Sequence, residues 1–115
     1  MAATENALRL LAIAASAADD KGGEDLVALD ISEPLPLVDI FLLVTGRNER
    51  NVIAISNEIE DKMIEAGVKT IRREGRAEGR WILLDFGDLV VHVFHEEERM
   101  YLSFSSENKG LWRSW

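Results

Sequence analysis

The fold of this chain is decided by one stretch, which reads Trp81–Ile82–Leu83–Leu84–Asp85–Phe86–Gly87–Asp88–Leu89–Val90–Val91–His92–Val93–Phe94–His95. Two runs rich in apolar, β-branched and aromatic residues flank the pair Gly87–Asp88, whose residue types favour a tight turn. The pattern predicts two strands, at about 81–86 and 89–95, joined as a hairpin.

Helical patterns occupy two other parts of the chain. Residues 4–20 and 48–66 carry apolar side chains at helical spacing, and a glycine follows each segment. Thr4 and Asn48 stand where a side chain can cap the first turn. The sequence therefore predicts one helix at each place.

The remaining strand patterns are shorter. Residues 26–31 alternate and predict a half-buried strand, whereas residues 40–44 are uniformly apolar and predict an interior strand that is covered on both faces. A further short strand is predicted at 68–71. The order helix, strand, strand, helix, strand, strand, strand predicts an α/β fold: a single domain with a mixed sheet of about five strands flanked by helices.

The composition excludes several classes of protein. The chain has 115 residues, enough for a single domain, and its 47% hydrophobic content is too high for a disordered acidic tail. It contains no cysteine, which rules out disulfides, cysteine nucleophiles and cysteine zinc sites. The longest uncharged N-terminal run, Leu10–Ala18, has nine residues against the ~20 that span a bilayer, so we expect a cytoplasmic protein.

The formal net charge of −8 argues against a phosphate backbone as the main partner. The charge is uneven along the chain, with a local +3 over residues 69–80 and a local −5 over residues 85–98. One interpretation is a solvated surface with cross-strand ion pairs. The other is a split surface, whose acidic part meets a basic protein and whose basic loop touches nearby RNA. Trp81 lies at the border, as a candidate binding hot spot or as part of the core.

Asp85 and Asp88 are the acidic candidates for catalysis. With Phe86 and Gly87 they spell the metal-binding motif of kinases, but the other kinase motifs do not fit in 115 residues. A two-metal site needs carboxylates that alternate along a strand, and the chain has no Asp-x-Asp. Turn residues are the favoured interpretation. A small metal-dependent nucleotidyltransferase or nucleotide-binding protein is the alternative.

The two histidines of the chain, His92 and His95, are the candidate metal ligands. They are three residues apart on a predicted strand, so their side chains point to opposite faces and do not hold one metal together. The segment Gly46–Glu49 fits an Asn-capped turn between strand and helix better than an anion site. We therefore expect no metal, no cofactor and no catalytic residue.

One long, ordered motif goes beyond these patterns. Residues 79–94, with 72–75 and 96–99 beside them, resemble the ribosomal silencing factor family, also called RsfS or Iojap-like. The resemblance covers roughly residues 5–101, through further blocks at Glu24–Asp30, Asp39–Gly46 and Asn48–Arg50. It implies a fold related to the nucleotidyltransferases but without their catalytic carboxylates.

The resemblance also implies a function and a partner. Members of the family are expected to bind the large ribosomal subunit through its ribosomal protein number fourteen, and to block joining of the small subunit sterically. Translation then falls when nutrients are scarce or in stationary phase. Such a protein is not an enzyme, and the family is expected to form a homodimer when free.

The family motif locates the candidate contact residues around the loop between Gly75 and Gly79 and in the last hairpin. They are Glu74, Trp81, Leu83, Asp85, Asp88, Val90 and His92. A peripheral contact with ribosomal RNA is expected through Lys69, Arg72, Arg73 and Arg76. After Tyr101 the sequence departs from the family pattern, so we divide the chain into a family domain at 1–101 and an atypical C-terminal tail at 102–115.

Overall fold

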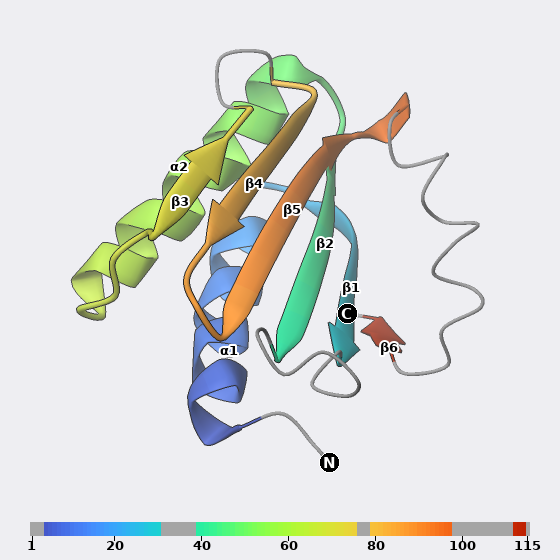
Figure 1. Cartoon of the computed structure of the whole chain (residues 1–115). Helices are drawn as coiled ribbons and strands as arrows, with labels where there is room; N and C mark the ends of the chain where they lie inside the picture. The colour runs from blue at the N-terminus through green and yellow to red at the C-terminus, as the bar shows by residue number, and fades with distance from the viewer. Residues whose placement is uncertain (1–3, 31–38, 76–78, 98–111, 115) are drawn as a thin grey trace.

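The computed structural model of the chain describes residues 4–30, 39–75, 79–97 and 112–114 (Figure 1). In these ranges it has two helices and six strands, which are α1 (Glu5–Asp20), β1 (Glu24–Asp30), β2 (Ile40–Gly46), α2 (Glu49–Glu65), β3 (Arg72–Glu74), β4 (Trp81–Asp85), β5 (Leu89–His95) and β6 (Trp112–Ser114). The strands form one sheet in the order β3-β4-β5-β2-β1-β6. The predicted α/β fold with a mixed sheet of about five strands is confirmed, and the three-residue β6 adds a strand beside β1.

Strand β2 lies inside the sheet, as its uniformly apolar sequence predicts. It runs parallel to β5, with pairs from Ile40–Leu89 to Gly46–His95, and antiparallel to β1. Leu42 and Val44 pack into the main core, whereas Leu43 packs into a second, smaller cluster on the other face. A strand that buries side chains on both faces has no solvent-facing side, which explains why residues 40–44 do not alternate between apolar and polar.

Both helices cover the same face of the sheet (Figure 1). They pack against each other and against one face of the strands, and the small Ala7, Ala14 and Ala18 of α1 are fully buried at this contact. The predicted caps are present: Thr4 Oγ1 accepts from the Ala7 amide at 3.1 Å, and Asn48 Oδ1 accepts from the Asn51 amide at 2.7 Å. Within the described ranges, neither helix has the length and apolar character to cross a membrane.

The predicted strand at 68–71 is wrong. Residues 68–70 are not in a strand, and the ladder with β4 begins at Arg72. The Val68 amide instead donates to the Met63 carbonyl at 2.8 Å, and Thr70 Oγ1 donates to Glu60 Oε2 at 3.0 Å. These bonds hold Val68 and Thr70 against the end of α2, and the Ile71 amide is the part of the segment that bonds to β4, at 2.7 Å from the Asp85 carbonyl oxygen.

Gly75 follows β3 in a left-handed backbone conformation that residues other than glycine rarely adopt. Its φ is +80°, and a Cβ at this position would overlap the backbone carbonyl oxygen of Trp81. Gly67 has a similar φ of +83° but no atom within 4 Å of the place of a Cβ. The two glycines therefore separate the cost of the backbone conformation from the cost of overlap.

We predict that Gly75→Ala destabilises the protein more than Gly67→Ala. The Gly67 variant meets only the left-handed backbone penalty of about 1–2 kcal/mol, whereas the Gly75 variant adds about 1–3 kcal/mol for overpacking against β4. Urea unfolding of both variants measures the difference. Equal losses of unfolding free energy would contradict the close approach of Gly75 to β4.

Candidate docking surface

The face of the sheet opposite the helices collects the predicted contact residues. We call it the helix-free face. It is defined by the side chains of β4, β5 and β2 that point away from the helices: Trp81, Leu83, Asp85, Val90, His92, Phe94, Phe41 and Leu43. Across the strands they align in rows, because Trp81 pairs with Phe94, Leu83 with His92 and Asp85 with Val90. Paired residues of neighbouring strands share a face. Five of the seven predicted contact residues therefore lie together.

Glu74 extends this face at the edge of the sheet. It pairs with Leu83 in the β3–β4 ladder, so its side chain lies on the same side. It is exposed and forms an ion pair with Arg72, with 3.3 Å between Glu74 Oε2 and Arg72 Nε. Glu74 and Arg72, which pairs with Asp85 in the same ladder, thus place charged groups at the border of the helix-free face.

Aromatic rings occupy the middle of the helix-free face. The His92 ring meets Phe41 edge-on at 4.9 Å between centroids and lies parallel to Phe94 at 5.9 Å. Trp81 lies over Phe94 at 5.0 Å. Phe94 and Phe41 were not among the predicted contacts, although Phe94 follows His92 by two residues, so strand alternation alone places them on one face.

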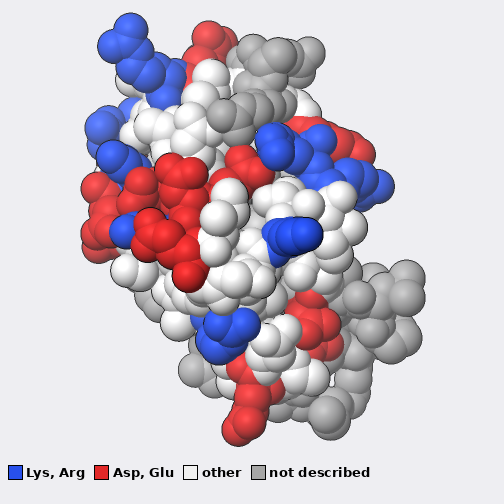
Figure 2. Space-filling model, turned by 90° about the vertical axis from the view of Figure 1, so that its left-hand side faces the viewer, with Lys and Arg blue, Asp and Glu red and all other residues white. Residues whose placement is uncertain are grey.

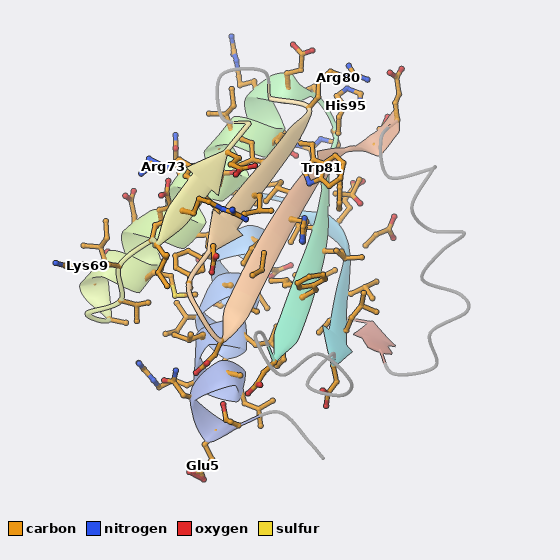
Figure 3. All side chains as sticks on the ribbon, in the orientation of Figure 1. Glu5, Lys69, Arg73, Arg80, Trp81 and His95 are labelled. Carbon is orange, nitrogen blue, oxygen red and sulfur yellow. The ribbon has the colours of Figure 1, made fainter. Side chains whose placement is uncertain are left out.

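Trp81 is the exposed member of this cluster. Its side chain is 46% exposed, whereas Val90 and His92 are 6% and 9% exposed. Figure 3 shows Trp81 on β4, in front of the sheet and away from the helices. Trp81 therefore presents apolar surface outward, while the buried neighbours form the layer on which it rests.

His92 accepts a hydrogen bond from Trp81. The distance from Trp81 Nε1 to His92 Nδ1 is 3.2 Å, and a donor at this position requires an unprotonated Nδ1. Burial lowers the pKa of His92 from its ordinary value of 6.5 to about 4. His92 is therefore neutral at pH 7, with its proton on Nε2, and its Nδ1 is available to the indole.

The two candidate acids of the hairpin do not converge. Asp85 Oδ1 accepts from the Gly87 amide at 2.9 Å, which closes the β4–β5 turn. Asp88 Oδ2 accepts from the Asn6 side-chain amide at 2.8 Å, at the start of α1. Asp85 thus lies on the helix-free face and Asp88 is tied to the helix layer. In the described ranges no group of three acidic or histidine side chains is placed to hold a metal ion.

The acidic run over residues 85–98 is not one patch. Asp85 and Asp88 lie at one end of β5, whereas Glu96 and Glu97 follow its other end. A seven-residue strand is about 20 Å long, so the two pairs are separated by that distance. Glu97 also binds Arg80 at 2.9 Å, and this hydrogen bond lowers the pKa of Glu97.

Ion pairs engage much of the basic segment. Arg73 Nε lies 3.2 Å from Oε2 of Glu60, a nearly buried carboxylate of α2 that sequence patterns did not single out. Arg72 pairs with Glu74, Lys69 is exposed, and Arg76 lies outside the described residues. Figure 2 shows Lys and Arg side chains interspersed with Asp and Glu on this side of the molecule. The sequence left open ion pairs across strands, but these two arginines pair within β3, for Arg72, and between β3 and α2, for Arg73.

The pH dependence of stability tests the burial of His92. The folded-state pKa of about 4 lies below the ordinary value of 6.5, so between these pH values the unfolded chain binds a proton that the folded chain excludes. The free energy of unfolding therefore falls as pH decreases from 6.5 to about 4, by about 3 kcal/mol from this group. Urea unfolding across this range should give a shallower pH dependence for His92→Phe than for the wild type or for His95→Gln. The same dependence of unfolding free energy on pH in the wild type and His92→Phe would contradict the lowered pKa of His92.

Comparisons with known proteins agree with this architecture. The family model described as "ribosomal silencing factor during starvation" matches residues 4–112. The ribosomal silencing factor RsfS of Bacillus subtilis is 46% identical over 96 residues, which are 84% of this chain and 81% of that protein.

Two solved structures share the fold. A crystal structure from Chromobacterium violaceum has a TM-score of 0.82 at 34% identity and covers 87% of this chain and 83% of that chain. A crystal structure from Bacillus halodurans has a TM-score of 0.79 at 40% identity and covers 87% of this chain and 93% of that chain. Since the family model spans nearly the whole chain, and the relatives are similar to it in sequence and the solved structures in fold, the chain belongs to the ribosomal silencing factor family.

Proposed function

We propose that this protein represses translation in the cytoplasm by occupying the large ribosomal subunit. The helix-free face docks on ribosomal protein number fourteen of that subunit, and the bound protein prevents the small subunit from joining in nutrient limitation or stationary phase. Membership of the ribosomal silencing factor family supports the role. The gathering of Trp81, Leu83, Asp85 and Glu74 on one side of the sheet supports the surface.

The proposed action is steric and needs no chemical step. A folded body of 12.9 kDa at a subunit interface takes up volume that the other subunit requires. Repression then follows the fraction of large subunits that are occupied, and that fraction depends on affinity and concentration. The residues that matter for repression are therefore those that set the affinity of the docking surface for its partner.

The observation that carries the proposal is the half-exposed Trp81 on a buried aromatic layer. Tryptophan is enriched among residues that dominate binding energy, particularly where neighbours exclude water around it. The carboxylates of Glu74 and Asp85 lie in adjacent rows and outnumber Arg72 beside them, so this border suits a partner with basic side chains. An apolar centre with an acidic border is the arrangement expected for a specific contact with a basic protein.

We predict that Trp81→Ala weakens binding to large ribosomal subunits by about 30-fold, the loss typical of a hot-spot residue. Co-sedimentation of the purified chain with large subunits at increasing protein concentration measures the affinity. Ile64→Ala is the matched control, because Ile64 is also exposed, at 64%, but lies on α2 in the helix layer. Equal binding of both variants would rule out the helix-free face as the docking surface, and failure of the wild type to bind large subunits or impede their joining would rule out the function.

A charge reversal at Glu74 tests the acidic border. We predict that Glu74→Lys lowers the association rate by several-fold and reduces its dependence on salt, because border charges act mainly on the encounter. Asp61→Lys makes the same change of charge at an exposed position of α2 and should have little effect. Association rates on immobilised large subunits at two salt concentrations provide the measurement. An equal effect of both variants would show that the net charge of the protein, rather than the position of Glu74, sets the association rate.

The proposal includes two further contacts. One is a peripheral contact of the basic segment 69–76 with ribosomal RNA, for which phosphates have to compete with the ion pairs of Arg72 and Arg73. The dependence of binding on salt should therefore be shallow. The other is a homodimer of the free protein, which light scattering tests. Among the residues that the structure describes, the candidate acids do not support the alternative of a nucleotidyltransferase, because Asp85 and Asp88 bond in different layers.

A further inference from the structure

The hydrogen bond between Trp81 and His92 joins an exposed side chain to a buried one. Trp81 is 46% exposed and His92 is 9% exposed, on neighbouring strands. The indole N–H points inward, 3.2 Å from His92 Nδ1, rather than to solvent. The indole N–H of Trp81 therefore has a hydrogen-bond acceptor within the chain in the absence of a bound partner.

We propose that His92 is a positioning residue of the docking surface: its Nδ1 holds the Trp81 indole in the orientation in which that ring meets the partner protein. The inference rests on the proposed function, because it assigns a role at the same surface. His92 itself is buried, so it acts through Trp81 rather than as a contact of its own.

Two physical effects favour binding when the indole is held in this way. An exposed tryptophan that is already in one rotamer loses less side-chain entropy on binding. An indole N–H buried against a partner without an acceptor weakens the complex, and His92 removes this requirement from the partner. Together we expect the bond to strengthen binding by about three- to tenfold.

The surroundings keep His92 in the form that this role requires. Its cross-strand partners are Leu83 and Leu43, which are both apolar, and its ring lies between the rings of Phe41 and Phe94. Such a site disfavours the protonated, charged imidazole. Nδ1 therefore remains an acceptor throughout the neutral pH range.

Two variants separate the hydrogen bond from the packing of the ring. His92→Phe keeps an aromatic ring but removes the acceptor. His92→Asn loses the ring but places an amide oxygen near the position of Nδ1. In the full-length chain, the indole N–H signal of Trp81 is identified by its loss in Trp81→Phe, since the chain has three tryptophans. We expect His92→Phe to move this signal and to speed its exchange with water, and His92→Asn to restore slow exchange.

Binding to large ribosomal subunits then links this bond to function. We expect His92→Phe to weaken binding by about three- to tenfold and His92→Asn to recover part of the loss, with the folded fraction of each variant verified by circular dichroism. In the Trp81→Phe background, which has no indole N–H, His92→Phe should change the affinity little. A loss of equal size in both backgrounds would show that His92 acts by another route and would overturn the inference.

The outcomes distinguish the inference from the proposed function. If the wild type binds large subunits and His92→Phe binds equally well, the positioning role is wrong and the function stands. If the wild type does not bind large subunits, the function fails, and the positioning role fails with it even where the indole signal responds to His92.

Discussion

The parallel ladder between β2 and β5 is the constraint on which the rest of the structure depends. Parallel neighbours cannot be joined by a tight turn, so the chain has to cross over from the end of β2 to the start of β5, and α2, β3 and β4 lie on that route. The crossover sets α2 beside α1 on one face and brings the β4–β5 hairpin next to β2. With both helices on one side, the other face of the sheet is left to the strands themselves.

That other face explains why a half-exposed tryptophan and a buried histidine occur together. The strand period of two brings Trp81, Leu83 and Asp85 to the face that also carries His92. A buried imidazole without a partner would be costly, and so would an indole N–H enclosed at an interface. The bond between the two side chains satisfies both atoms. The same hydrogen bond therefore contributes to the stability of the fold and, in the proposed docking mode, to the orientation of Trp81.

The sequence predicted the local structure well because the deciding interactions are local. The hairpin follows from two apolar runs around Gly87, and both helix caps follow from Thr4 and Asn48. Prediction was wrong where contacts outside the strand pattern decide the outcome. Val68 and Thr70 follow the end of α2 because Met63 and Glu60 accept their hydrogen bonds, whereas the Ile71 amide bonds to Asp85 of β4. Asp88, which belongs to the same turn motif as Asp85, bonds instead to Asn6, which lies 82 positions away in the chain.

The sequence by itself therefore determined the fold class, the position of both helices and four of the strands, and the family motif, since periodicity, turn residues and capping are properties of neighbouring residues. The tertiary structure decided which face remained without helices, which acids share a surface and which basic residues are already paired. Strand alternation brings Trp81 and Asp85 to a common face, but only the placement of both helices on the opposite side leaves that face without a covering helix. The tertiary structure also separates the charges, because the acids counted together in the sequence lie in two groups at opposite ends of β5, which carries no acid itself.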